Sequence, residues 1–311
     1  EIYTLSLHDA LPIYELNKFS YAVTMQPHEG CEAKSKAGYA FRLSKPRIVI
    51  PVFPGSGSEN DVRRAFEAGG GNCTLVNVRN LNGHLIARSF RELAAAIKTA
   101  QIVFIPGGFS GGDEPDGPAK FISAVFTNAY VREAIEELLS CRDGLLAGIG
   151  NGFQGLINTG LLPFGEYREK TEESPTLTKN DVGEHVSRMI NTRIISTKSP
   201  WMSRFKVGDV YTMPVSHSYG KFYCTDSELL SYIRNGQIAA QYTDKYGNSG
   251  MDIEINPNGS IGGIEALTSP DGKILGKMAH SERMFGENLY KNMPKSENQN
   301  IFKAGIDYFK G

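Results

Sequence analysis

Short apolar stretches that alternate with helical patterns constrain the fold of this 311-residue chain more than any other feature. Residues 47–53 form an almost continuous run of β-branched and other apolar side chains, which is typical of a strand buried on both faces of a parallel sheet. Residues 74–78 and 101–106 give two more strands, with a helix at residues 90–100 between them. This alternation predicts an α/β fold with a doubly wound, mainly parallel sheet, in which ligands bind at the carboxyl ends of strands.

Further elements complete the predicted fold. Ser58 is the expected N-cap of a helix that follows the first strand. One long amphipathic helix is expected at residues 118–139, where it would cover a face of the sheet. The block from residue 236 to residue 260 is expected to form a strand, a turn and a second strand that begins at Met251, with turns at residues 246–248 and 256–259. The chain therefore contains hairpin-like elements beyond the alternating core.

Residues 143–156 combine an apolar run, a glycine-rich turn and the start of a helix. A strand-turn-helix lifts the residue at its apex out of the sheet and directs the N–H groups of the helix toward it, as in a nucleophile elbow. The apex is Gly150, which has no side chain to attack with. A dinucleotide-binding turn would need glycine where the sequence has Phe153. On local sequence alone, a turn that only joins a buried strand to a helix is the simplest interpretation.

The elbow also resembles that of a known family. Gly148-Ile-Gly-Asn-Gly-Phe-Gln is similar to the Gly-Ile-Cys-Asn-Gly-Phe-Gln elbow of class I glutamine amidotransferases, specifically of the glutaminase domain of single-chain phosphoribosylformylglycinamidine synthases. Gly150 stands where that family has its catalytic cysteine. The resemblance implies the class I glutamine amidotransferase fold, with flanking helices and extra β-hairpins. It also implies strands that extend or flank the central sheet near residues 174–178, 185–188 and 198–202.

His280 and Glu282 stand two residues apart after an apolar strand. If the chain stays extended there, both side chains fall on one face, and the carboxylate can fix the tautomer of the imidazole. Such a pair alone is weak evidence, because similar pairs are common on wet surfaces. It coincides with the His-x-Glu of the family, and the resemblance implies that His280 takes the proton of the cysteine and later gives it to ammonia, while Glu282 orients the ring.

The resemblance also implies groups that hold the substrate and its developing oxyanion. Backbone N–H groups at a glycine turn can point at such an oxygen without obstruction. The turn at Gly108 and Phe109, which follows the third predicted strand, and Asn151, which follows the apex, occupy the family's positions for this role. Gln154 completes the elbow motif as a candidate substrate-binding residue.

His217 is a further candidate, in a segment aligned with a loop of the family. The family loop reads Pro-x-x-His-Gly-Glu-Gly-Arg-Phe, and Ser218 and Tyr219 replace its Gly and Glu. A lone histidine in a loop is more often structural or solvated than functional. The sequence leaves the role of His217 open.

Composition fits an ordinary cytoplasmic enzyme. Hydrophobic residues make up 40% of the chain and charged residues 22%, so the chain can bury a large core. The net charge of −1 argues against a nucleic-acid or membrane-surface partner, and no run of about 18 apolar residues suggests a membrane span. The cysteines are widely scattered and predict reduced thiols rather than a metal site: Cys31, Cys73, Cys141 and Cys224.

Three segments are expected: a foreign segment at residues 1–13, a linker or tail of a preceding synthase region at 14–45, and an amidotransferase domain at 46–311. The resemblance implies that this domain hydrolyses glutamine and passes the ammonia to an ATP-dependent site. That site converts formylglycinamide ribonucleotide to its amidine in de novo purine biosynthesis. Glutamine and the ATP-using synthase region are the implied partners; ATP and Mg are cofactors of that region, and none is expected in this domain.

Because of Gly150, membership of the family does not imply glutaminase activity for this chain. Without sulfur no thioester can form, so the chain is expected to be an inactive glutaminase as written. The alternative is a non-catalytic, amidotransferase-like binding domain that docks on the synthase and holds glutamine without cleaving it. An unrelated α/β hydrolase would need a serine or cysteine at the elbow, and the sequence has neither there.

Overall fold

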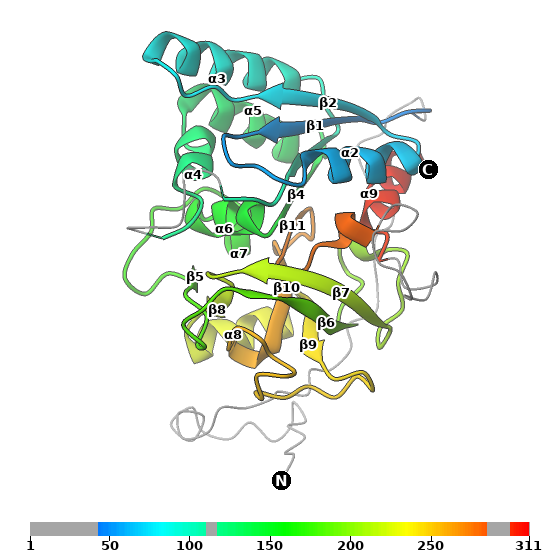
Figure 1. Cartoon of the computed structure of the whole chain (residues 1–311). Coiled ribbons are helices and arrows are strands. Elements are labelled where there is room, and N and C mark those ends of the chain that lie inside the picture. Colours follow the sequence, from blue (N-terminus) through cyan, green and yellow to red (C-terminus); the bar gives the residue numbers. More distant parts are fainter. Residues whose placement is uncertain (1–42, 110–116, 285–298, 311) are drawn as a thin grey trace.

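The computed structural model describes residues 43–109, 117–284 and 299–310, so the predicted segment at 1–13 and nearly all of the one at 14–45 lie outside the described residues. Its main element is a nine-stranded sheet with the order β2-β1-β3-β4-β11-β10-β9-β6-β7 (Figure 1). One half is parallel: β2 (Asn72–Asn77), β1 (Arg47–Val52), β3 (Ile102–Ile105), β4 (Leu145–Ile149) and β11 (Ile274–Lys277). The other half is antiparallel: β10 (Ile264–Thr268), β9 (Ile238–Thr243), β6 (Val186–Ile194) and β7 (Val210–His217).

Helices cover both faces of the parallel half, which confirms the doubly wound α/β prediction. Side chains of β1 alternate between two cores, with Val49 in one and Ile48 and Ile50 in the other. The first core includes residues of α3 (Gly83–Ile97), α4 (Lys120–Phe126), α5 (Ala129–Ser140) and α6 (Asn151–Asn158). The second includes residues of α2 (Glu59–Ala68), the 3₁₀ turn η1 (Pro200–Met202) and α9 (Ile301–Lys310). The strands at the centre are therefore buried on both sides.

Aromatic packing joins the second core across long sequence distances. The rings of Phe66 in α2 and Phe302 in α9 lie 5.0 Å apart, and each lies 5.3 Å from Phe104 in β3. These separations fall in the favourable range for aromatic pairs. Because all three side chains are fully buried, this cluster fixes α2 and α9 side by side on the sheet, as Figure 1 shows.

Smaller elements complete the fold. A two-stranded antiparallel sheet pairs β5 (Thr176–Thr178) with β8 (Lys221–Tyr223). The remaining helical elements are α7 (Leu161–Phe164), α8 (Asp226–Arg234), η2 (Ile261–Gly263) and η3 (Ser281–Met284). The antiparallel pairing of β6 with β7 and of β10 with β11 supplies the expected extra hairpins.

Two predicted helices differ from those in the structure. The single helix expected at residues 118–139 is two helices, because the chain breaks at Thr127 and Asn128, where the Asn128 side chain accepts a hydrogen bond from Tyr130 N–H and starts α5. The helix expected at 90–100 begins earlier, at Gly83, because the Asn82 side chain caps it by accepting from Leu85 N–H. In both cases an asparagine cap fixes the boundary.

The N-cap prediction for Ser58 is correct in position but wrong in mechanism. Ser58 does precede α2, but its hydroxyl makes no capping bond. The hydroxyl accepts instead from Gly107 N–H, at 2.9 Å, and so ties the start of α2 to the turn after β3.

Three expectations for the antiparallel half are wrong. The second strand expected from Met251 is absent, and residues 251–255 form turns, because the N–H groups of Ile255 and Asn256 donate back to the carbonyl of Asp252. Residues 198–202 form the turn η1 rather than a strand, and the Ser199 side chain caps it. His217 is not in a loop but is the last residue of β7. Local turn-forming hydrogen bonds decide the first two cases, from the backbone in the first and from a side chain in the second.

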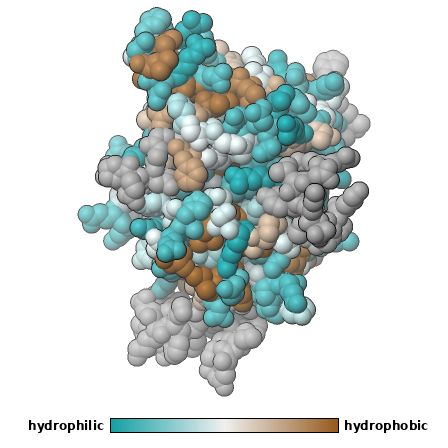
Figure 2. All heavy atoms as spheres, in the orientation of Figure 1, coloured by the Kyte–Doolittle hydropathy of each residue, from teal (hydrophilic) through white to brown (hydrophobic). Residues whose placement is uncertain are grey.

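Figure 2 shows the surface in the orientation of Figure 1, with hydrophobic residues at the upper corner over the start of α3. Leu81, just before α3, is 82% exposed and is among the exposed large hydrophobic residues of the described chain. Scattered exposed residues of this kind are normal on protein surfaces. Among the described residues, no helix combines the length and apolar character needed to cross a membrane.

Candidate active site

The turn between β4 and α6 has the backbone of a nucleophile elbow. β4 is fully buried, and α6 begins at Asn151, immediately after Gly150. Gly150 adopts φ +54° and ψ −111°, which L-residues rarely adopt, and its N–H donates to the Lys277 carbonyl at 2.8 Å. The apex therefore stands at the carboxyl end of the parallel sheet, held between β4 and β11.

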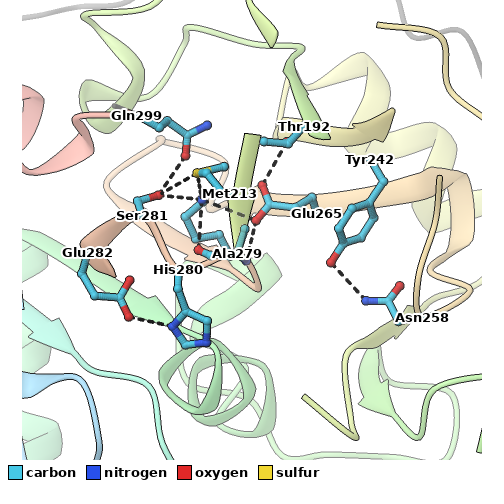
Figure 3. Close-up of polar contacts among 11 residues, drawn as sticks. Thr192, Met213, Tyr242, Asn258, Glu265, Ala279, His280, Ser281, Glu282 and Gln299 are labelled. Atoms are coloured by element: carbon cyan, nitrogen blue, oxygen red, sulfur yellow. Dashed lines mark hydrogen bonds and ion pairs between the residues drawn. The ribbon is translucent and has the colours of Figure 1, made fainter. Parts of the chain in front are cut away.

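His280 lies directly beside this apex. A Cβ built on Gly150 would lie 3.3 Å from His280 Cε1 and 3.6 Å from Nε2. The other ring nitrogen, Nδ1, lies 2.7 Å from Glu282 Oε1 (Figure 3). Since a carboxylate accepts hydrogen bonds, Nδ1 carries the proton, and Nε2 is the nitrogen nearest the apex. A thiol side chain at position 150 would thus be within reach of a base whose partner is already in place.

Glu282 is completely buried behind His280. Burial alone would raise the pKa of this carboxyl, but the adjacent His280, its hydrogen bond and the nearby Arg283 hold the pKa below its ordinary value. Contrary to the extended chain expected from the sequence, Glu282 lies in the 3₁₀ turn η3, and the turn brings the carboxylate back onto the ring. His280 and Glu282 are therefore in contact as predicted, but a 3₁₀ turn rather than an extended chain brings them together.

A buried ion pair lies behind the His280 segment, at the boundary between β10 and β11. Lys277 Nζ lies 3.5 Å from Glu265 Oε1, and it donates to the Ala279 carbonyl at 3.1 Å and to the Ser281 hydroxyl at 2.8 Å. Glu265 accepts in turn from Ala279 N–H at 2.8 Å. Both residues before and after His280 are therefore held by the same pair. Burial lowers the pKa of Lys277, and Glu265 opposes that shift.

The turn after β3 lies beside the same apex, where a Cβ built on Gly150 would be 3.8 Å from Gly107 Cα. Gly107 N–H donates to Ser58 Oγ, and Phe109 N–H donates to the Gly55 carbonyl at 2.8 Å. Within the described residues, Gly108 N–H is the one of these three consecutive groups without an acceptor. The close approach requires glycine at 107, because a Cβ there would lie 2.7 Å from His280 Cε1. Gly108 itself has φ +146°.

Gln154 joins α6 to the segment after β7. Its amide donates to the Tyr219 carbonyl at 2.5 Å, and its oxygen accepts from the Asn151 side chain at 2.8 Å. Both ends of the Gln154 side chain are therefore engaged, so it forms a fixed wall of the site.

One pocket collects the predicted residues. It encloses about 360 Å³ including its open mouth, and its lining contains all of them except Glu282, which lies behind His280: Gly108, Phe109, Gly150, Asn151, Gln154, His217 and His280. Phe109 is 48% exposed. The two halves of the sheet thus contribute to a single site.

Sequence reasoning missed several residues of this pocket. Ser216, Met278 and Arg283 line it alongside Ser218. His185 stands outside the lining, with its ring nitrogens 3.0 Å from Ser216 Oγ and 3.1 Å from Ser218 Oγ. Position within three residues of His217 or His280 was a usable signal for Ser216, Met278 and Arg283. No local signal pointed to His185, because pairing of β6 with β7 brings it there.

His217 lies deep in the site. Only 3% of it is exposed, and its Nδ1 lies 3.1 Å from Asn180 Oδ1. Burial, together with the charges of His280 and His185, lowers the pKa of His217 to about 3. The ring is therefore neutral near pH 7, and its burial excludes the solvated role that was one of those the sequence left open.

No cysteine in the described residues can replace the missing thiol. Cys73, Cys141 and Cys224 are absent from the pocket lining, and Cys31 lies outside the described residues. Burial raises the pKa of Cys73 to about 12 and that of Cys224 still further. Likewise, within the described residues no three His, Cys, Asp or Glu side chains gather as metal ligands would.

Fold and site define a glutamine amidotransferase. A model of the CobB/CobQ-like glutamine amidotransferase domain matches residues 45–309, so the chain belongs to this family. It is 32% identical over 239 residues to the phosphoribosylformylglycinamidine synthase subunit PurQ of Aquifex aeolicus, a match that covers 76% of this chain and 90% of that protein. It is 27% identical over 286 residues to PurQ of Methanococcus maripaludis, which covers 85% of this chain and 98% of that one.

A solved structure supports the same fold. PurLQS from Thermotoga maritima matches with a TM-score of 0.60 at 22% sequence identity, and the match covers 85% of this chain and 99% of that chain. At this identity the likeness concerns the fold.

Proposed function

We propose that this chain is the glutaminase component of a phosphoribosylformylglycinamidine synthase whose nucleophile position has lost its thiol. The support is the family membership together with relatives named as the PurQ subunit of that synthase. Such a component hydrolyses glutamine and supplies ammonia to the ATP-dependent step of the synthase, in purine biosynthesis. The partner is accordingly the remaining part of that synthase, as the name of the PurLQS structure suggests.

The arrangement suits thiol chemistry at position 150. A thiol there would give its proton to His280 Nε2 and attack the carboxamide carbon of glutamine. The carbonyl oxygen would become an oxyanion facing Gly108 N–H and the start of α6, where the first N–H groups of a helix favour negative charge. His280 would then return the proton to the departing ammonia, and water would cleave the thioester. Glu282 would stabilise the imidazolium formed between these steps.

With Gly150 this series of reaction steps cannot begin, because no thiol is present to form the first bond. The elbow, the base and the oxyanion donors can still position glutamine, but no atom attacks it. As written, the chain is a domain that holds glutamine without cleaving it, and this state coincides with the non-catalytic alternative raised by the sequence.

The single observation that carries the proposal is the position of the His280 ring. Its Nε2 lies 3.6 Å from the Cβ position of residue 150, while its other nitrogen contacts a buried carboxylate. A histidine that only packed in the core would need neither relationship. Moreover, the elbow keeps φ +54° at Gly150, in the range of the strained backbone found at functional turns.

Glutamate release by the parent chain and by Gly150→Cys tests the proposal, with and without the remaining synthase components. Loss of a nucleophile costs on the order of 10⁶ in turnover in the subtilisin triad, and the elbow angles cost a non-glycine residue roughly 1–3 kcal/mol. We therefore expect Gly150→Cys to release glutamate at least about 10⁴-fold faster than the parent chain.

Gly150→Ala is the matched control, because it adds the Cβ and the same backbone strain without sulfur. It should stay as inactive as the parent chain. Equal rates for the glycine and cysteine forms would refute the thioester mechanism. Inactivity of Gly150→Cys even with its partner would show that this pocket is not a competent glutaminase site.

A further inference from the structure

The hydrogen bonds of Asn180 determine which nitrogen of His217 carries the proton. The Asn180 amide nitrogen donates to the carbonyls of His217, at 2.8 Å, and Glu184, at 3.1 Å. Its oxygen, Oδ1, accepts from Gly220 N–H at 3.0 Å. The orientation of the amide is thus fixed by three backbone groups. Because Oδ1 can only accept, the His217 Nδ1 that lies 3.1 Å from it must be the donor.

The other nitrogen of the ring is then an acceptor. A neutral imidazole with its proton on Nδ1 has a lone pair on Nε2, on the ring edge that points away from Asn180. Nε2 is buried and has no hydrogen-bond partner in the described part of the chain. The ring lines the pocket that contains Gly150 and His280. The pocket therefore contains an acceptor whose partner is not supplied by the described protein groups.

The neighbouring pocket hydroxyls already have partners on the other side. Ser216 and Ser218 flank His217 in sequence, and both of their hydroxyls lie within hydrogen-bond distance of His185. The low pKa of His217 keeps Nε2 unprotonated under ordinary conditions, so it is a poor proton carrier. His217 Nε2 can therefore act as a hydrogen-bond acceptor but not as a proton carrier.

We propose that His217 Nε2 accepts a hydrogen bond from an N–H group of bound glutamine and thereby helps to select it. This inference rests on the proposed function of the pocket and assigns His217 a binding role there. Glutamine offers two kinds of donor, the carboxamide NH₂ and the α-ammonium group. Glutamate has no carboxamide donor and would bring a carboxylate oxygen to a lone pair instead, so an acceptor facing the carboxamide discriminates substrate from product.

Two substitutions distinguish the role of Nδ1 from that of Nε2 in His217. His217→Asn places an amide NH₂ near the position of Nδ1, so it can still donate to Asn180 but removes the acceptor. His217→Gln reaches the position of Nε2 with an amide oxygen, so it retains an acceptor but loses the bond to Asn180. A purely structural histidine would be harmed more by His217→Gln, whereas a ligand-binding one would be harmed more by His217→Asn.

Isothermal titration calorimetry measures the binding, with the full chain and its synthase partner present. The parent chain suits this measurement because Gly150 leaves glutamine intact during the titration. We expect His217→Asn to weaken glutamine binding by roughly 3- to 10-fold, the loss of one hydrogen bond, and His217→Gln to stay within about 2-fold of the parent. Equal affinities of the parent and His217→Asn would overturn the inference.

Two analogues identify which donor is bound. If the carboxamide donates, His217→Asn lowers the preference for glutamine over glutamate and leaves the preference over glutaramate, which lacks the α-ammonium group, unchanged. If the α-ammonium donates, the reverse holds. Either result supports the proposal, and unchanged preference against both analogues contradicts it.

A spectroscopic measurement on the parent chain covers the case in which a variant fails to fold. With ¹⁵N-labelled histidine, the resonance of the unprotonated His217 Nε2 should move upfield when glutamine is added, as for a nitrogen that gains a hydrogen bond. No movement at saturating glutamine would overturn the inference while leaving the proposed function intact. A parent chain that binds no glutamine at all, even with its partner, would overturn both.

Discussion

The parallel and antiparallel halves of the sheet each contribute a histidine to the same pocket, and the two histidines are held in different ways. His280 follows β11, the last strand of the parallel half, and its partner is the carboxylate of Glu282, two residues away. His217 ends β7, at the far edge of the antiparallel half, and its partner is the neutral amide of Asn180, 37 residues away. Two identical side chains in one pocket therefore have chemically different partners, a carboxylate and a neutral amide.

A carboxylate and an amide have different effects on an imidazole. Glu282 accepts the hydrogen bond of His280 Nδ1 and so leaves Nε2, the nitrogen beside the apex, as the group that takes up and returns a proton in the proposed mechanism. Asn180 fixes the tautomer of His217 but supplies no charge, so burial keeps that ring neutral. In the proposed mechanism the parallel half thus supplies the proton carrier, and the antiparallel half supplies a hydrogen-bond acceptor.

We expect the largest effect when His280 is given an amide partner, like the one that His217 has. Glu282→Gln in a Gly150→Cys background replaces the carboxylate with an amide of nearly the same shape. We expect glutamate release to fall by about 10²–10⁴-fold, the range for losing acid–base function or the correct tautomer. Steady-state kinetics measure this, with glutamine binding to each variant as the control for folding. A Glu282→Gln variant that retains the full rate would show that the carboxylate is not needed.

The parallel half could be predicted well from sequence, because its functional residues follow strands in the chain. Apolar runs located β1, β3 and β4, and the carboxyl ends of parallel strands meet at one edge of the sheet. Gly108 and Gly150 therefore had to lie near each other. The contact of His280 with Glu282 needed only a two-residue spacing, although the local structure is a 3₁₀ turn rather than the expected extended chain.

The antiparallel half could not be predicted in the same way. The environment of His217 depends on Asn180 and Gly220, and on Asn258, which donates to the Gly220 carbonyl at 2.7 Å. These residues are separated by up to 78 positions, the difference between 258 and 180, and no periodic pattern connects them. A buried network of single hydrogen bonds leaves no signal in hydrophobic periodicity, so the sequence left the role of His217 open.

The ion pair at the boundary of the two halves tests whether they are energetically coupled. Lys277→Met leaves Glu265 buried without its cation, and we expect the free energy of unfolding to fall by about 3–5 kcal/mol. Chemical denaturation measures this loss. The double variant Lys277→Met/Glu265→Gln removes both charges and should recover most of the stability. A single variant as stable as the parent would mean that the pair does not hold the boundary.

The neutral state of His217 predicts a pH dependence. Its pKa in the folded protein, about 3, lies below the ordinary value of 6.5, so between these values the unfolded chain binds the proton more strongly. The free energy of unfolding contributed by this group is therefore lost as the pH falls from about 6.5 toward 3, by up to about 1.4 kcal/mol per pH unit.

Denaturation of the parent chain and His217→Gln across this range checks the prediction. The difference in the free energy of unfolding between the two should change with pH below 6.5 and level off above it. A difference that is constant from pH 4 to 8 would show that His217 titrates normally, and would remove the contrast between the two histidines.

Covalent labelling tests whether the pocket is a thiol glutaminase site that lacks only its sulfur. A glutamine analogue with an electrophilic diazoketone in place of the carboxamide alkylates a thiol that a neighbouring base activates. Mass spectrometry should show that Gly150→Cys gains one adduct at position 150, that excess glutamine blocks it, and that the parent chain gains none in the pocket. Labelling of the parent chain at another residue with the same protection by glutamine, or no adduct at position 150 in the variant, would show that the pocket is not such a site.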